Sequence, residues 1–214
     1  MINKCCYTAI FSNYEELKTP AIIPDGWDFI VFTDQPLKSN VWKIVQIKPD
    51  LPSQRMARMV KILPHVFLPQ YEYTFWLDAS FQINIDLNLF WNKYFKASLS
   101  APAHPIRNCV YREIASCIAN KRGDEEQLRN QELVYKRENI PAFNGIITSG
   151  VLMRQKTPAC IKYCDDWWEE LSKHSARDQV AFAKISVNWQ NNTFVWDYSQ
   201  SKELKYYKHY HKRH

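Results

Sequence analysis

The chain has 214 residues, of which 46% are hydrophobic and 14% aromatic, and this composition indicates one globular domain and excludes a disordered segment. Its formal net charge of +6 favours polyanions, anionic lipid surfaces or phosphorylated ligands as partners. Only four glycines are present, and neither GxGxxG nor GxxxxGK(S/T) occurs, so the glycine-rich nucleotide-binding loops are excluded.

No apolar run approaches the roughly 18 residues that span a bilayer, and the start MINKCCYTAIF lacks the pattern of a signal peptide. We therefore expect a cytoplasmic protein, with the inner face of the membrane as a second location if the basic C-terminal tail contacts it. Six cysteines show neither a CxxC pair nor a zinc-ligand spacing, so we expect reduced, mostly buried thiols. Cys5 and Cys6 are adjacent in a predicted strand and should point to opposite faces.

In chain order, strands are predicted over residues 5–11, 27–33 and 41–47. The turn Pro24-Asp25-Gly26 introduces the second strand, and Asp34 follows its end. A helix is predicted over 54–68, divided or kinked by Pro64. Its apolar face carries Met56, Met59, Val60, Leu63 and Phe67, while Arg58, Lys61 and His65 share the opposite face. That basic face is either solvated surface or the lining of an anion site.

The segment YTFWLDASFQIN at 73–84 organises the rest of the chain. A continuous apolar run over 73–77 ends in Asp78, which is typical of a buried central strand that presents a carboxylate at its C-terminal end. Ligands of open α/β sheets bind outside those ends, so Asp78 is the first candidate site residue. The alternative is that Asp78 caps a turn through its side chain.

Later elements alternate in the same way. The pattern predicts an Asp86-capped helix at 86–95, an extended segment at 99–104, helices at 109–121 and 125–137, a strand at 146–154 interrupted by Ser149-Gly150, a helix at 158–171, a Ser175-capped helix at 178–185 and a strand at 193–196. A glycine inside a strand often marks the close approach of a ligand or another backbone. Alternating strands and helices predict an α/β fold with a mixed, mainly parallel sheet.

Five strings together resemble one family of glycosyltransferase-like domains, which includes plant Golgi proteins tied to mucilage polysaccharides and many bacterial proteins. They are YTAIFSNYE at 7–15, FIVFTD at 29–34, RMARMVKILPHVFLPQYEYTFWLDAS at 55–80, HPIRNCVYREIASCI at 104–118 and WWEELSKHSARDQVAF at 167–182. The resemblance covers about residues 5–185 and is weak over the last thirty. It implies a single Rossmann-like domain of the GT-A type over residues 1–200, followed by a basic tail over 201–214.

The resemblance also implies a transferase that moves a sugar from a nucleotide-diphosphate sugar to a glycan, glycolipid or other hydroxyl acceptor, in surface polysaccharide biosynthesis. GT-A enzymes usually carry Asp-x-Asp where this chain has Asp78-Ala79-Ser80. A Mn²⁺ or Mg²⁺ ion would then be held by Asp78 with further ligands, for which His209 and His211 are candidates, or the cations of Arg58 and Lys61 would replace part of its charge.

Donor binding is assigned to residues near the ends of the first strands and to the basic helix face, because carboxylates suit ribose hydroxyls and cations suit a departing diphosphate. The predicted donor set is Thr8, Ala9, Phe11, Asp34, Arg58, Lys61, Asp78 and Ser80. Residues expected to orient the acceptor or the donor sugar are His104, Arg107, Ser149, Gly150, Arg177 and Gln179. His104 is equally well explained as a core histidine bonded to a carbonyl.

Asp178 is the predicted catalytic base and Glu113 the second candidate, because an inverting transferase needs a carboxylate to take the acceptor proton. Asp178 alternatively complements a helix dipole from the first turn. Two other functions compete: hydrolysis of an amide or ester on a lipid, and non-catalytic binding of a nucleotide or nucleic acid through the aromatic tail. No RNA-binding motif occurs, so nucleic acid is not expected as a partner.

Overall fold

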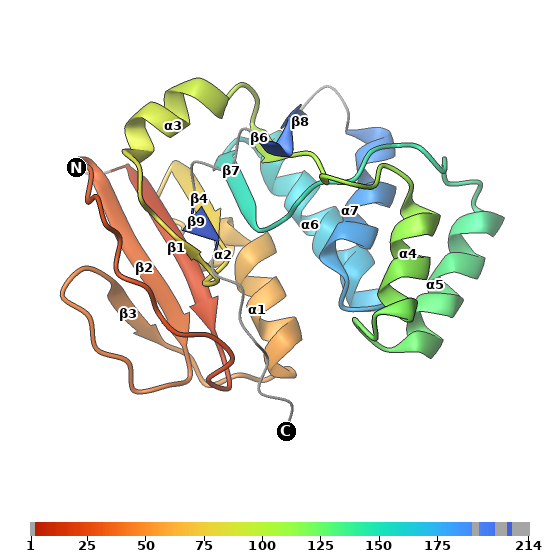
Figure 1. Ribbon diagram of the computed structural model, residues 1–214, viewed down its shortest axis with the longest axis horizontal. Helices are drawn as coiled ribbons and strands as arrows, with labels where there is room; N and C mark the ends of the chain where they lie inside the picture. Colours follow the sequence, from red (N-terminus) through yellow and green to blue (C-terminus); the bar gives the residue numbers. More distant parts are fainter. Residues whose placement is uncertain (1–2, 190–192, 200–204, 207–214) are drawn as a thin grey trace.

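The computed structural model describes residues 3–189, 193–199 and 205–206. A sheet of seven strands forms its centre, in the order β3-β2-β1-β4-β7-β6-β8 (Figure 1). The strands are β1 (Lys4–Ile10), β2 (Trp27–Thr33), β3 (Lys43–Gln46), β4 (Tyr73–Leu77), β6 (Leu99–Pro102), β7 (Val151–Gln155) and β8 (Thr193–Trp196). Each lies within two residues of its predicted position, except that β7 begins only after the Ser149-Gly150 interruption.

Strands β1, β2, β3 and β4 run parallel, and β7 is inserted antiparallel between β4 and β6. β6 and β8 pair in parallel. The predicted mixed, mainly parallel α/β sheet is therefore confirmed. Because β7 runs in the opposite direction, its beginning lies beside the end of β4, with the backbone N–H of Asp78 donating to the carbonyl of Gly150 at 2.9 Å.

Seven helices surround the sheet in the described part of the chain (Figure 1): α1 (Ser53–Ile62), α2 (Pro64–Phe67), α3 (Leu87–Tyr94), α4 (Val110–Ala119), α5 (Glu125–Arg137), α6 (Pro158–Lys173) and α7 (Asp178–Ile185). One face packs against α1, α2, α6 and α7, and the opposite face packs against α3. Cys5 lies in the first of these two cores and Cys6 in the second, as strand alternation predicts. All six cysteines are free and buried.

Helices α4 and α5 form a hairpin beside α7, with a third apolar cluster between them (Figure 1). This small cluster extends the domain beyond the edge of the sheet. Its consequence for the site is that α7 is covered on two sides, by α6 and by the hairpin, so the residues at its beginning are buried.

Local signals set several helix ends as predicted. Pro64 separates α1 from α2, since a proline inside a helix removes one backbone donor and clashes with the preceding turn. The Asp86 carboxylate accepts from the N–H of Asn88 and caps α3. The predicted Ser175 cap of α7 is wrong: Arg177 precedes that helix, and the buried Ser175 hydroxyl donates instead to Gln131 Oε1 at 2.6 Å.

Part of the predicted tail is paired with the domain. β9 (Lys205–Tyr206) pairs antiparallel with β5 (Phe81–Gln82), directly after the Asp78 turn. His209 and His211 lie outside the described residues. Among the residues that the structure describes, none of the helices is both long and apolar enough to cross a membrane.

Candidate functional site

The site lies at the carboxyl edge of the sheet, where β1, β2 and β4 end and β7 begins. Asp78 follows β4 and opens a turn in which its carbonyl accepts from the N–H of Phe81 at 2.9 Å. Its side chain does not cap that turn. Asp78 Oδ1 accepts from Trp76 Nε1 at 2.6 Å and from Lys61 Nζ at 3.2 Å, and the side chain is 35% exposed.

Lys61 is the centre of the charge network. Its side chain is only 1% exposed, although the helix pattern placed it on the basic face of α1. Lys61 Nζ contacts Asp178 Oδ2 at 2.7 Å and donates to Ser149 Oγ at 3.2 Å, besides its contact with Asp78. Of the two interpretations of the basic face, solvated surface is therefore wrong for Lys61, because Asp78, Ser149 and Asp178 surround its ammonium group.

Asp178 is buried at 2% exposure and lies among cations. Besides Lys61, it contacts Arg58 Nε at 3.4 Å and accepts from Ser149 Oγ at 2.8 Å. Burial alone would raise the pKa of Asp178, but the charges of Arg58, Lys61 and Arg177 outweigh it and hold that pKa far below its ordinary value. The carboxylate is therefore ionised and serves as the counter-charge that fixes these cations.

Gly150 leaves room for the Asp78 carboxylate. A Cβ atom at position 150 would lie 3.1 Å from Asp78 Oδ2 and 3.1 Å from Phe81 Cε2. The sequence predicts a close approach at this glycine, and the approaching groups are these two side chains. The small residue thus sets how near β7 comes to the Asp78 turn.

A small pocket adjoins Asp78 on the α3 side of the sheet. Thr8 lines it together with Lys18 and Trp42, and Thr8 Oγ1 is buried with no hydrogen-bond partner among the described residues. Such an atom costs free energy unless a ligand or water satisfies it. Of the other predicted donor residues, Ala9 and Phe11 pack into the apolar core, and Ser80 lies in the Asp78 turn.

Asp34, at the end of β2, is hydrogen-bonded to the turn that follows β1. Its two carboxylate oxygens accept from the backbone N–H of Ser12, at 3.0 and 3.2 Å, and Oδ1 also accepts from Gln35 Nε2. The Ser12 and Ser53 hydroxyls are hydrogen-bonded. Asp34 therefore ties together the turns after β1 and β2 at the same edge.

A second charged cluster continues from Asp178 toward α4. Glu113 is buried and accepts from Arg107 Nε at 2.5 Å, with Arg177 Nη2 at 3.7 Å from its other oxygen. His104 Nδ1 accepts from the backbone N–H of Arg107 at 3.0 Å, and His104 Nε2 lies 3.1 Å from Arg107 Nη2 and 3.8 Å from Glu113. Burial lowers the pKa of His104, with the Glu113 charge opposing.

Arg177 joins the two clusters. Its Nη2 donates to Gln179 Oε1 at 3.1 Å, and Gln179 in turn donates to the carbonyl of Ile147 at 2.8 Å. The Nε–H groups of Arg177 and Arg58 are buried and make no hydrogen bond among the described residues. Arg58 Nε is ion-paired with Asp178, but neither guanidinium Nε–H is hydrogen-bonded within the described ranges, and two such donors beside a half-open carboxylate indicate a site for an anionic ligand.

The segment after β1 supplies three residues that the sequence pattern did not assign. The Lys18 ammonium donates to the carbonyl of Ala79 at 3.0 Å, which places this loop over the Asp78 turn. Tyr14 lies close enough to Arg58, Asp78 and Arg177 for their charges to act on its hydroxyl. Burial is the main cause that raises the pKa of Glu15 to about 7; the charge of Lys18 lowers this pKa, and the charge of Asp78 raises it. The only signal for Glu15 was its place at the end of YTAIFSNYE.

The described residues do not assemble a complete metal site. No group of three or more His, Cys, Asp or Glu side chains is placed to hold an ion in the described ranges. Asp78 Oδ2 has no hydrogen-bond or ion-pair partner among those residues and offers one hard ligand oxygen. Two or more further protein ligands would have to come from other parts of the chain.

The fold and the edge site define an α/β domain with a mixed, mainly parallel sheet and a charged cluster at its carboxyl edge. The chain belongs to the family of the TOD1/MUCI70 glycosyltransferase-like domain, whose profile matches residues 31–210. This confirms the family indicated by the five strings, and the match extends into the segment predicted as tail.

Two known proteins illustrate the relationship. The chain is 22% identical over 227 residues to "Probable hexosyltransferase MUCI70" of Arabidopsis thaliana, an alignment that covers 88% of this chain and 39% of that protein. Among solved structures, the apo structure of the bifunctional glycosyltransferase WbbM matches with a TM-score of 0.53 and 7% identity, over 91% of this chain and 38% of that chain. The structural likeness supports the fold alone, and the chain spans well under half the length of either protein.

Proposed function

We propose that this domain is a glycosyltransferase that uses a nucleotide-diphosphate sugar as donor and a hydroxyl group of a glycan or glycolipid as acceptor. A role in surface polysaccharide synthesis, a cytoplasmic location and contact of the basic tail with a membrane belong to the same proposal. Family membership supports the reaction class, and the hexosyltransferase name belongs to the longer relative.

One observation carries the proposal: at the carboxyl edge of the sheet, beside Asp78, the buried Nε–H of Arg177 has no acceptor among the described residues, and that of Arg58 is ion-paired with Asp178 at 3.4 Å without a hydrogen bond. Buried arginine donors are normally satisfied, and a diphosphate presents several charged oxygens to such donors. The contacts of Lys61 and Asp178 fix α1 and the beginning of α7, which carry the two arginines, against the turns after β4 and before β7. The ligand would therefore meet a preorganised surface.

The donor would extend from these arginines into the pocket beside Asp78. There Thr8 Oγ1 offers an unpaired hydroxyl, and Trp42 and Lys18 form further walls. The Trp42 ring and the Thr8 hydroxyl, which lies near the end of β1, suit a nucleoside. Asp78 Oδ2 would accept a hydroxyl of the ribose or the sugar.

The chemical step needs a base and a stabilised leaving group. The acceptor oxygen bonds to the anomeric carbon, the bond from that carbon to the diphosphate oxygen breaks, and the diphosphate leaves with the electron pair. Arg58 and Arg177 would stabilise its growing charge. The acceptor proton passes to a carboxylate if the reaction inverts the configuration.

Among the carboxyl groups, Glu15 suits this role better than the two predicted bases. Asp178 and Glu113 are both buried and paired with cations, so neither is accessible to an acceptor hydroxyl. Glu15 lies in the loop over Asp78, and its pKa near 7 matches proton transfer at neutral pH. Asp178 then becomes a positioning residue that orients Lys61 and Arg58.

Mn²⁺ or Mg²⁺ remains part of the proposal. Such an ion would supply positive charge to the diphosphate, and Asp78 Oδ2 is the described oxygen that fits it. His209 and His211, outside the described residues, are the further candidates from the sequence.

A thermal-shift screen tests the proposal. UDP, GDP, CDP and ADP are each added with and without Mn²⁺, because a ligand of the folded state raises the apparent melting temperature. We expect one diphosphate to stabilise the protein and Asp78→Asn to weaken the shift about 10-fold or more in ligand concentration. Asp165→Asn, on the exposed side of α6, is the matched control. No shift with any diphosphate, or equal shifts in wild type and both Arg58→Met and Arg177→Met, would contradict the proposal.

Turnover of the matching nucleotide sugar then tests the base. Glu15→Gln should lower kcat about 100-fold while leaving the nucleotide affinity within about 3-fold, and should remove the acid limb of the pH profile near neutrality. An unchanged acid limb would exclude Glu15 as the base without affecting the donor-binding proposal.

A further inference from the structure

A second buried cation lies on the same sheet, away from the carboxyl edge. Arg154 in β7 is 1% exposed and pairs across the sheet with Thr74, near the beginning of β4. Its Nη1 donates to the hydroxyl of Tyr7 at 2.9 Å, while Nε and Nη2 have no hydrogen-bond partner among the described residues. Burying a guanidinium without a counter-charge is costly, so its surroundings need an anionic partner.

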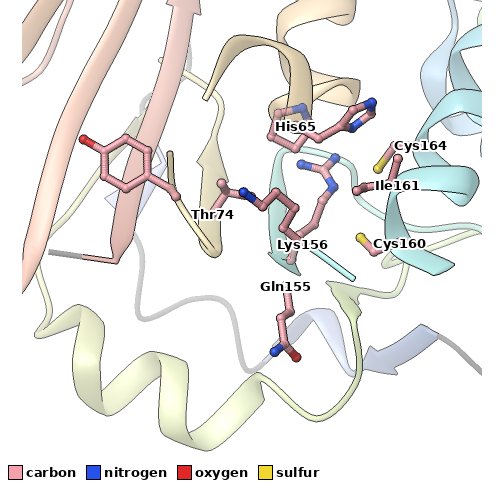
Figure 2. A pocket seen from close by; sticks show the side chains of 10 residues that line it. His65, Thr74, Gln155, Lys156, Cys160, Ile161 and Cys164 are labelled. Atoms are coloured by element: carbon pink, nitrogen blue, oxygen red, sulfur yellow. The ribbon is translucent and has the colours of Figure 1, made fainter. Parts of the chain in front are cut away.

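The groups around Arg154 are thiols and an imidazole. A small pocket between α2, β7 and α6 is lined by Arg154, His65, Lys156, Cys160 and Cys164 (Figure 2). In Figure 2 the His65 ring and the sulfur atoms of Cys160 and Cys164 face the same space from opposite helices. No carboxylate of the described residues lines this pocket, although residues of its lining contact three: His65 pairs with the half-exposed Asp165 at 3.0 Å, Tyr71 donates to Asp28 and Gln155 donates to Glu72.

These contacts act on the sulfur of Cys164. The two thiols act as a pair: the interaction with Cys160, then Arg154 and His65, hold the pKa of Cys164 below its ordinary value against the effect of burial, and the same interaction raises the pKa of Cys160. The interaction with Cys164 is also the largest cause that raises the pKa of His65. The titratable or charged groups that face Cys164 from all neighbouring elements are Tyr7 on β1, His65 on α2, Arg154 and Lys156 on and after β7, and Cys160, Tyr163 and Asp165 on α6.

The geometry points to Cys164 as a modification site: a cysteine whose sulfur is activated by Arg154 and His65 and is attacked through the pocket by small electrophiles of the hydroperoxide class. In this step the sulfur of the thiolate attacks one peroxide oxygen, an S–O bond forms, the O–O bond breaks and hydroxide leaves. Cysteine is oxidised by two electrons to sulfenic acid, and the peroxide is reduced. The proposal does not depend on the transferase activity.

The pocket also restricts which reagents reach the sulfur. Cys164 is 1% exposed, and the pocket beside it admits molecules near the size of water. Hydrogen peroxide is the hydroperoxide closest in size to water, so the pocket hinders it least, whereas it excludes bulky alkylating reagents. Cys160 lines the same pocket, but its hydrogen bond to Cys164 and its burial raise its pKa well above the ordinary value, and burial raises the pKa of Cys6 far above its ordinary value. Selectivity for Cys164 therefore follows from both charge and size.

Modification of Cys164 would shift groups at the carboxyl edge of the sheet. Arg154 is linked to α1 by the hydroxyl of Tyr7, which donates to the carbonyl of Lys61 at 2.8 Å. On α6, Trp167 lies one turn beyond Cys164, and its Nε1 donates to the carbonyl of Asp178 at 2.9 Å. An added oxygen atom between α2 and α6 would press on both of these connections.

The experiment exposes the full chain to hydrogen peroxide at about pH 6, quenches with catalase, unfolds the protein in an alkylating reagent and maps each cysteine by peptide mass. We expect Cys164 to be oxidised at least about 10-fold faster than any other cysteine, with a rate that changes little between about pH 6 and about pH 8. Arg154→Met should slow it about 10-fold. Cys6→Ser, which removes a thiol on the opposite face of the sheet, should leave the Cys164 rate unchanged.

Two results would overturn the proposal. One is oxidation of all six cysteines at similar rates in the folded protein. The other is a Cys164 rate in wild type that rises about 10-fold per pH unit over this range, as an ordinary thiol does. The wild-type pH profile decides the matter even if Arg154→Met fails to fold.

Discussion

Lys61 and Arg154 are both cations at 1% exposure on the same side of one sheet, yet their surroundings differ. Lys61 contacts two carboxylates and a serine hydroxyl at the carboxyl edge. Arg154 makes one hydrogen bond, to a tyrosine, and otherwise faces thiols and an imidazole. The pKa of Asp178 is held far below its ordinary value, so this carboxylate keeps its charge near neutral pH, whereas thiols change charge with pH and oxidation.

The difference separates a fixed charge network from one that responds to its environment. Around Lys61, ionised partners hold four elements in a constant arrangement, which is what a ligand site requires. Around Arg154, the net charge depends on the state of Cys164. Substitutions at the two positions should therefore have different costs.

The largest effect is expected from Lys61→Met. It leaves the buried Asp178 with fewer counter-charges, and breaking such a network costs about 3–5 kcal/mol of unfolding free energy. Arg154→Met removes a cation that has no carboxylate partner, so we expect a loss below about 1.5 kcal/mol. Urea unfolding of both variants measures the two losses of unfolding free energy. Equal losses would remove the distinction between the two regions.

The pH dependence of stability gives the next largest effect. The pKa of Cys164 is lowered in the folded state, so its contribution is complete above the ordinary thiol pKa and is lost as the pH falls toward the folded value. The pKa of His65 is raised, so its contribution is present below the ordinary imidazole pKa and is lost as the pH rises. The two contributions change stability in opposite directions as the pH rises, so the contribution of Cys164 has to be measured in a protein that lacks His65.

The isolating comparison is His65→Gln against His65→Gln/Cys164→Ser. The protein that retains Cys164 should gain about 1–2 kcal/mol relative to the double variant between about pH 6 and about pH 9. Denaturant unfolding at several pH values measures it. A flat difference would mean that Cys164 carries no charge in the folded state.

Gly150→Ala should have a moderate effect at the carboxyl edge. The added Cβ, 3.1 Å from Asp78 Oδ2 and from the Phe81 ring, forces these groups back by a few tenths of an ångström. We expect a loss of about 1 kcal/mol and weaker diphosphate binding. The loss should shrink in an Asp78→Ala background, since a close contact between two positions makes their effects non-additive. Full additivity would place the strain elsewhere.

Asp165→Asn is expected to have the smallest effect on stability. Its carboxylate is half exposed and pairs with His65, and such pairs contribute about 0.2–1 kcal/mol. The variant tests the Arg154 cluster alone, because it removes the negative charge beside His65 and leaves Arg154 and its contacts unchanged. Thermal unfolding measures its stability, and a loss above about 2 kcal/mol would show that the Arg154 cluster depends on this acid.

Most of the fold followed from local patterns. The apolar run before Asp78, the turn before Trp27 and the position of Pro64 each act over a few residues, and each gave an element within one or two residues of its place. Asp78, Asp178 and Ser149 were each candidates in the sequence, and the structure brings them together through Lys61. Which groups share a contact is set by the tertiary arrangement and not by sequence spacing.

The failures have the same physical origin. Helix periodicity separates the two faces of α1 but does not show which groups of β4, β7 and α7 will meet the basic one, so the sequence pattern allowed Lys61 to face solvent. Ser175 fits a cap by sequence, but burial gave its hydroxyl a different partner in Gln131. The loop with Glu15 is polar, and nothing in a polar loop shows which strand end it will cover. Arg154 carried no signal, since a single basic residue in a strand predicts neither burial nor partners.

The position of the Lys61 ammonium has a consequence for how the chain becomes a folded unit. It comes from the first half of the sequence, while Ser149 and Asp178 come from the second half, and the Tyr73–Leu77 and Val151–Gln155 strands join the same halves through hydrogen bonds. A polypeptide cut after Ala97 would separate Asp178 from Lys61 and Arg58 and would leave both fragments with an open sheet edge. The two pieces should therefore gain ordered structure only when mixed, in one cooperative association.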